Sequence, residues 1–201
     1  MDRTDRQLLS DWKNGESGAF TVLVRRYQDA LLRHARGLLG RGSSYEDVVQ
    51  EVFLKLAREP LELIGAQHVR DRTEHGQSLA AWLHTVTRNA CMDTIRTDQR
   101  RKTREAAVAA PEATGGGQQT VDAQDTRNRV EAAITGLPID QREVLILRLL
   151  AGRSYREIAE VTGRKVGTVG WLISEGLRSL NGTLSPLMEA EQSSGNGMGI
   201  A

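Results

Sequence analysis

Basic side chains and one asparagine are the residues of this sequence whose types and spacing could do chemistry, and that chemistry is nucleic-acid binding. Between Arg88 and Arg104, six basic and two acidic residues give a local charge of +4, whereas the whole chain carries only +1. Lysine and arginine hold phosphates, and Asn89 in the same stretch could reach a base edge. A solvated helix face could carry the same charges, so this stretch alone leaves both interpretations open.

A neighbouring stretch has the opposite charge. From Glu46 to Glu62, five acidic residues stand against Lys55 and Arg58, which gives a local charge of −3. One basic and one acidic surface on a small domain indicate two different partners.

The stretch "SYREIAEVTGRKVGTVGWLISEGL" predicts a helix-turn-helix. Counting from Tyr155, Ala159 is the fifth residue, Gly163 the ninth and Val169 the fifteenth, which provides a small residue at the crossing, a left-handed turn and an apolar anchor. A generic helical hairpin is the alternative.

In a helix-turn-helix the start of the second helix enters the major groove, where its N-terminal dipole also favours phosphate. The expected contacts are Arg153, Arg164, Lys165, Thr168 and Trp171, although Trp171 and Leu172 could instead form an apolar patch for a protein partner.

Catalytic and metal-binding patterns are absent from the sequence. The four histidines, at 34, 68, 75 and 84, have no metal-ligand spacing, and "ATGGGQQT" lacks the lysine of a phosphate-binding loop. The single cysteine, Cys91, excludes an intramolecular disulfide and is expected to be a small buried residue. We therefore expect no catalytic residue, no metal and no cofactor, and a protein that is not an enzyme.

Helical periodicity runs through the chain and alternating β-branched runs are missing, which predicts an all-α fold. We expect two small helical domains joined by a flexible linker: an N-terminal domain over 1–102, an acidic linker over 103–127, a helix-turn-helix domain over 128–187 and a disordered tail over 188–201. Ser17, Ser43, Ser78 and Ser154 are expected helix caps, the second and fourth within capping boxes. The sequence has no signal-peptide core and no apolar run of membrane-spanning length, which predicts a cytoplasmic protein without membrane insertion.

Three segments together resemble the sigma-70 family of RNA polymerase sigma factors, in its extracytoplasmic-function (ECF) group. "SYEDVVQEVFLKLAR" is similar to the family's acidic helix that docks on the β′ clamp of the polymerase. "LAAWLHTVTRNACMDTIRTDQRRK" is similar to its helix that melts and reads the −10 element, and "LPIDQREVLILRLLAGRSYREIAEVTGRKVGTV" to its −35-reading domain. The matches lie in both domains and in the family's order, over roughly 18–180.

The resemblance implies a role for each group of residues. Asp47, Gln50 and Glu51 would bind core polymerase, and Lys55, Trp82, Asn89, Arg96, Arg100 and Arg101 would bind the −10 DNA. The partners would be core RNA polymerase (β′ clamp and β flap), promoter DNA and an anti-sigma factor. The acidic linker would follow the RNA exit path, whereas on composition alone it is a solvated tether.

Two departures from the family pattern concern the DNA contacts. The 59–77 loop contains no aromatic residue, so it does not identify the −10 base pocket. The second helix of the helix-turn-helix has Gly170, Leu172 and Glu175 where the family usually has Arg or Lys. Two alternative functions are a stand-alone transcriptional regulator of the response-regulator type and an enzyme.

Overall fold

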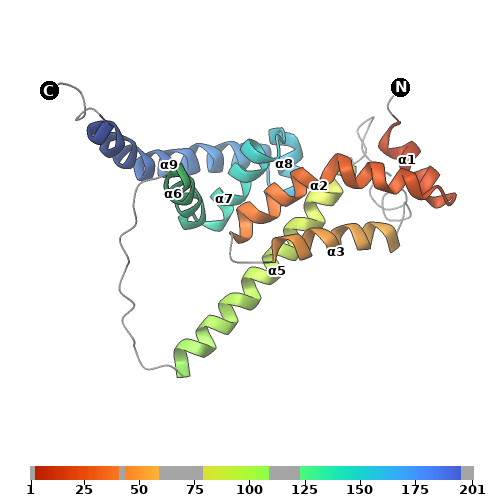
Figure 1. Ribbon diagram of the computed structural model, residues 1–201, viewed down its shortest axis with the longest axis horizontal. Coiled ribbons are helices and arrows are strands. Elements are labelled where there is room, and N and C mark those ends of the chain that lie inside the picture. Colours follow the sequence, from red (N-terminus) through yellow and green to blue (C-terminus); the bar gives the residue numbers. More distant parts are fainter. Residues whose placement is uncertain (1–2, 41–43, 59–78, 109–122, 196–201) are drawn as a thin grey trace.

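The computed structural model describes residues 3–40, 44–58, 79–108 and 123–195, and within these ranges every regular element is a helix (Figure 1). In chain order they are α1 (Asp5–Lys13), α2 (Ser17–Leu39), α3 (Tyr45–Arg58), α5 (Leu79–Val108), α6 (Ala123–Gly136), α7 (Ile139–Leu145), the π-helical turn η1 (Ile146–Leu150), α8 (Tyr155–Thr162) and α9 (Val166–Gly195). The predicted all-α fold is confirmed. No helix in the described ranges has the length and apolar character needed to cross a bilayer.

Among the described residues, α1, α2, α3 and α5 form an N-terminal bundle around one apolar core. Leu23, Tyr27 and Leu31 recur at helical spacing on α2 and are buried, because such spacing places them on one side of the helix. Cys91 of α5 is fully buried in the same core, and burial raises the pKa of its thiol to about 12. The C-terminal half of α5 projects beyond the bundle (Figure 1).

The helix-turn-helix has the local geometry that the sequence predicts. The Ser154 hydroxyl accepts the backbone N–H of Glu157, and the Glu157 carboxylate accepts the N–H of Ser154, which completes the capping box. Helix α8 ends at Gly163, whose φ of 68° lies in the left-handed region that favours glycine. Val169 and Ile173 of α9 are buried in the same core cluster as Ile158 of α8.

The two helical blocks pack against each other. Ile146 of η1 is 1% exposed and belongs to the core of the N-terminal bundle, while Ala81 of α5 belongs to the core of the C-terminal domain. Gly37 of α2 permits this approach, since a Cβ at that position would lie 2.7 Å from Ile146 Cδ1. Arg142 of α7 also donates a hydrogen bond of 3.1 Å to the Leu38 carbonyl. The two cores therefore interlock where η1 meets α2.

Several predicted boundaries differ from the structure. The cap of α2 is Glu16, without a side-chain hydrogen bond, and Ser17 is already helical. Helices α5 and α6 extend into both ends of the expected 103–127 linker, and α9 runs to Gly195 instead of ending at 187. The expected tail disorder is therefore corrected for 188–195, where "MEAEQ" supplies good helix formers. Several sequence expectations lie outside the described residues: Ser43, Ser78, the 59–77 loop, 109–122 and 196–201.

Candidate nucleic-acid interface

An exposed charged face runs along α3. Asp47, Gln50 and Glu51 are all exposed and recur at helical spacing, so they share one side of the helix. Leu54 lies on that side and is 40% exposed, a feature that sequence analysis missed because a leucine on an amphipathic helix is expected to be buried. The face thus combines carboxylates with an apolar contact, a combination suited to a protein partner. Lys55 is exposed at its edge.

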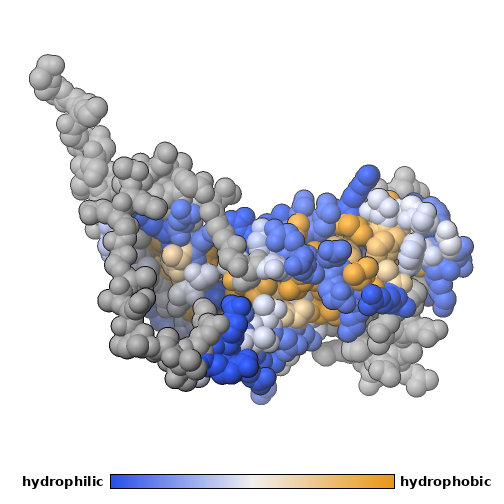
Figure 2. Space-filling model, turned by 60° about the horizontal axis from the view of Figure 1, so that its bottom comes forward, coloured by the Kyte–Doolittle hydropathy of each residue, from blue (hydrophilic) through white to orange (hydrophobic). Residues whose placement is uncertain are grey.

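A basic groove follows the projecting half of α5. An open groove of about 650 Å³ is lined by Arg96, Gln99, Arg100, Thr103 and Arg104. Two of the basic residues in this half contact acids on the same helix, Arg96 to Asp93 at 3.1 Å and Arg101 to Asp98 at 3.7 Å, and all four side chains are largely exposed. Ion pairs this exposed contribute little to stability, so phosphates could replace the acids. Figure 2, in which the bottom of the molecule is turned forward, shows a band of apolar surface between hydrophilic areas.

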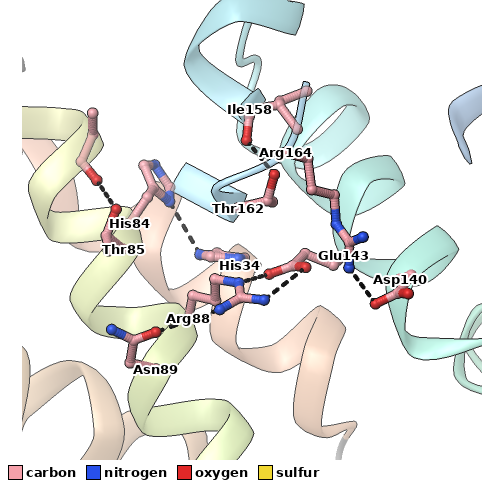
Figure 3. A network of polar contacts seen from close by, with 11 residues as sticks. His34, His84, Thr85, Arg88, Asn89, Asp140, Glu143, Ile158, Thr162 and Arg164 are labelled. Carbon is pink, nitrogen blue, oxygen red and sulfur yellow. Dashed lines mark hydrogen bonds and ion pairs between the residues drawn. The ribbon is translucent and has the colours of Figure 1, made fainter. Parts of the chain in front are cut away.

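Asn89 lies on the exposed side of α5 beside an ion pair that joins the two domains (Figure 3). Arg88 donates from Nε to Glu143 Oε1 and from a terminal nitrogen to Oε2 at 3.4 Å, and another terminal nitrogen lies 3.4 Å from the Asn89 amide oxygen. Glu143 of α7 is fully buried. Burial raises the pKa of its carboxyl, and the Arg88 guanidinium opposes that rise. The C-terminal domain is therefore tied to the residue next to Asn89.

Two histidines meet in the core although they are 50 residues apart. The Nδ1 atoms of His34 on α2 and His84 on α5 are 3.1 Å apart, so one ring donates to the other. Both side chains are fully buried, and neither Nε2 atom has a hydrogen-bond partner. The spacing of the histidines in the sequence does not indicate this contact, because only the tertiary fold brings the two rings together. Among the described residues, no group of three or more potential ligands could hold a metal ion.

Burial determines the protonation of this pair. It lowers the pKa of His84 to about 4, with Arg153 adding to the effect and Glu157 opposing it. Burial also lowers the pKa of His34 well below its ordinary value, with His84, Arg88 and Arg153 contributing in that order. Both rings are therefore neutral at pH 7, close to the charges of Arg88 on α5, Arg153 just before α8 and Glu157 on α8.

The histidine pair predicts a loss of stability in mild acid. The folded pKa values lie below the ordinary value of 6.5, so the unfolded chain binds more protons and stability falls as the pH drops from about 6.5 toward about 4. We expect a loss on the order of 1–2 kcal/mol per histidine between pH 7 and pH 5, measured by urea denaturation. The His34→Leu/His84→Leu variant should lose this component, so an identical pH dependence in both proteins would contradict it. Glu143, whose pKa is raised, acts in the opposite direction and is present in both.

Three of the expected DNA contacts have poorly exposed side chains. Trp82 is only 9% exposed and packs in the N-terminal core, so its side chain supports α5 in this structure, and its expected contact with the −10 DNA stays a prediction. Arg153 pairs with Glu157 at 3.0 Å, and its side chain is 19% exposed. Arg164 pairs with Asp140 at 2.5 Å, and its side chain is 26% exposed. The Arg153–Glu157 pair joins residues four apart, a spacing that the sequence shows, whereas Arg164 and Asp140 are 24 residues apart and meet only through the fold.

The remaining residues of the expected −35 interface lie in the first turns of α9 and at the residue just before it. Lys165, Thr168 and Trp171 are exposed, and the tryptophan is 60% exposed. Leu172 is 5% exposed and belongs to the domain core, so it forms no surface patch with Trp171.

Comparison with known families matches both halves of the chain. The family model "Sigma-70 region 2" matches residues 23–60 and "Sigma-70, region 4" matches residues 127–180. The ECF RNA polymerase sigma factor SigM of Mycobacterium tuberculosis is 28% identical over 168 residues, which cover 84% of this chain and 78% of the relative. The ECF RNA polymerase sigma-E factor of Escherichia coli K12 is 28% identical over 196 residues, 92% of this chain and 96% of the relative.

Solved structures give the same family. The sigma factor RpoE of Bartonella quintana, crystallised with the anti-sigma factor NepR, aligns with a TM-score of 0.60 and 27% identity over 83% of this chain and 96% of that one. The region 2 match covers most of α2 and all of α3 in the N-terminal bundle, and the region 4 match runs from α6 into α9 and includes the helix-turn-helix. The chain matches two regions of one family in the family's order, and its described elements are all helices. The chain therefore belongs to the sigma-70 family, as a sigma factor of the ECF group.

Proposed function

We propose that this sigma factor binds core RNA polymerase through the exposed face of α3 and directs it to promoters that it reads at two elements. The observation that carries this function is the presence of regions 2 and 4 in one chain. A stand-alone regulator would need only the helix-turn-helix, and region 2 would then be without a role. Sigma factors act in initiation as binding subunits, which agrees with a chain whose recognisable features are all binding surfaces.

The core-binding surface in this proposal is Asp47, Gln50 and Glu51, joined by Leu54. Its partner is the β′ clamp, and the C-terminal domain contacts the β flap. The three acidic and amide side chains are exposed on one side of α3, where an approaching basic surface would find them without any rearrangement of the bundle.

The −10 surface in this proposal is Lys55, Asn89, Arg96, Arg100 and Arg101. The groove along α5 supplies phosphate-binding groups, and Asn89 supplies the amide that a base edge needs. Reading an unpaired base requires its removal from the stack, at a cost of a few kcal/mol. The −35 surface is Lys165, Thr168 and Trp171, and an anti-sigma factor is a further partner, as the B. quintana relative has one.

The test is open-complex formation by reconstituted polymerase carrying the Asn89→Ala variant. Promoters come from start-site mapping after overexpression of the chain. We expect a loss of open complex of about 5- to 150-fold, since a base contact from an amide is worth about 1–3 kcal/mol. The loss is measured by permanganate reactivity of unpaired thymines. Core affinity, measured in parallel, should not change because Asn89 lies outside the α3 face. Equal open-complex formation by variant and wild type would refute the role of Asn89, and failure of the wild type to bind core would refute the function.

A further inference from the structure

Helix α9 is the second helix of the helix-turn-helix, which is the recognition helix of such motifs. Its exposed side has an apolar side chain at the centre. Gly167, Trp171, Ser174 and Arg178 follow one another at helical spacing on α9, and all four are exposed. Arg178 forms an ion pair with Glu175 on the same helix. The indole of Trp171 is thus the large side chain at the middle of the surface that a helix-turn-helix turns toward the major groove.

The packing of the domain does not account for two of the glycines beside Trp171. A Cβ at Gly167 would meet nothing within 4 Å, and one at Gly170 would make an ordinary contact of 3.6 Å with the Tyr155 ring. Gly176 differs, since a Cβ there would lie 2.6 Å from Leu145 Cδ1. Glycine is a poor helix former, so Gly167 and Gly170 weaken the helix without benefit to the core. Glycine at an exposed position is useful where another molecule must approach the backbone.

The position of the tryptophan relative to these glycines suits a flat contact. Side chains on a helix lean toward its N-terminus and cover the preceding turn. For Trp171 the preceding turn contains Gly167 and Thr168, so nothing bulky stands between the indole and a surface that approaches α9. The aromatic ring offers an apolar area to that surface, and no hydrogen-bond acceptor.

The charge around this apolar centre favours DNA as the occupant. From 148 to 178 the chain has six basic and three acidic side chains, for a net charge of +3. Lys165 and Arg156 are exposed at the margin, and the Arg148 guanidinium lies 5.4 Å from the centroid of the Tyr155 ring. An apolar side chain flanked by cationic ones is complementary to the major groove of DNA, in which thymine methyl groups lie between two rows of phosphates.

We propose that Trp171 reads the C5-methyl group of a thymine in the −35 element, with Gly167 and Gly170 allowing the close approach of the groove. This inference rests on the proposed function and specifies the chemistry of one base contact. Thymine is the base with a methyl group in the major groove, and apolar side chains are the groups that recognise it. Trp171 is therefore the residue that sets the base preference at its position.

The experiment replaces single thymines of the −35 region by deoxyuridine, which removes only the C5-methyl group. Polymerase holoenzyme containing the full chain binds duplex promoter fragments obtained by start-site mapping, and affinity is measured by competition. For wild type, one position should show an affinity about fourfold lower with deoxyuridine, the factor expected for one buried methyl group. In the Trp171→Ala variant the two fragments should bind equally, and Trp171→Phe should retain part of the difference.

Leu177→Ala is the matched control, because Leu177 is an apolar side chain that is 45% exposed on the same helix. It is not one of the four exposed residues Gly167, Trp171, Ser174 and Arg178. It should keep the full thymine preference. Indifference of the wild type to every deoxyuridine would overturn the proposal, as would an equal loss of affinity for all fragments with Trp171→Ala, which indicates a sugar contact. An unchanged affinity of Trp171→Ala would also overturn it. Failure of wild-type holoenzyme to bind any fragment would instead refute the proposed function itself.

Discussion

Replacing Arg88 with methionine is expected to destabilise the packed chain by about 3–5 kcal/mol, because it leaves the buried carboxylate of Glu143 without its partner. Glu143 is fully buried, whereas the Arg88 side chain is 23% exposed. The reverse change, Glu143→Leu, should therefore be milder, since Arg88 can turn toward water. Urea denaturation at pH 7.5 measures both variants.

The double variant Arg88→Met/Glu143→Leu serves as the control for this prediction. Replacement of both partners by apolar groups should restore stability to near that of the wild type. The stability of Arg88→Met relative to the wild type should also recover as the pH falls, because loss of the guanidinium raises the pKa of Glu143 further, and a folded-state pKa above the unfolded value favours the folded chain in acid. The histidine pair is present in both proteins and does not contribute to this difference. A double variant as unstable as Arg88→Met would show that the ion pair is not the cause.

Reversing the charge of Asp47 should weaken binding to core polymerase by about 10- to 100-fold, or about 1.4–2.7 kcal/mol, since it places a like charge against a basic partner at an exposed position. The side chain is exposed near the start of α3, so the Asp47→Lys change should not alter the fold. Fluorescence anisotropy of the labelled chain, titrated with core enzyme, measures the dissociation constant. The effect should diminish at high salt because exposed charges are screened.

Asp29→Lys is the matched control for Asp47→Lys. It makes the same charge change at an exposed position on α2, and it should leave core affinity near the wild-type value. Equal effects of the two variants would mean that net charge, rather than the α3 face, governs binding.

Local signals in the sequence predicted local structure well. The capping box of Ser154 and Glu157 and the left-handed Gly163 depend on residues three to five apart or on a single residue, and both are present. The resemblance to sigma factors identified the two regions for the same reason, since each is a contiguous motif. The ends of α5 and α9 were less predictable, because a helix can continue through residues of weak preference.

Contacts between distant segments could not be predicted. His34 meets His84 across 50 residues, and Arg88 meets Glu143 across 55, and no pattern in the chain connects them. The same limitation explains Trp82, whose position on α5 matched a DNA-binding helix but whose side chain is in the core. Periodicity places a residue on a face of a helix, and only the fold determines what covers that face.

The interlocked contact of Gly37 and Ile146 has a consequence for every partner that engages the two halves of the chain at a wider separation. Such a partner binds only the fraction of molecules whose halves are apart, so its apparent dissociation constant is the intrinsic one divided by that fraction. A population of one separated molecule in a hundred would weaken apparent binding about a hundredfold without any change at the binding surface. The packing of Ile146 against Gly37, together with the Arg88–Glu143 pair and the Arg142 hydrogen bond, would thus set how strongly such a partner binds.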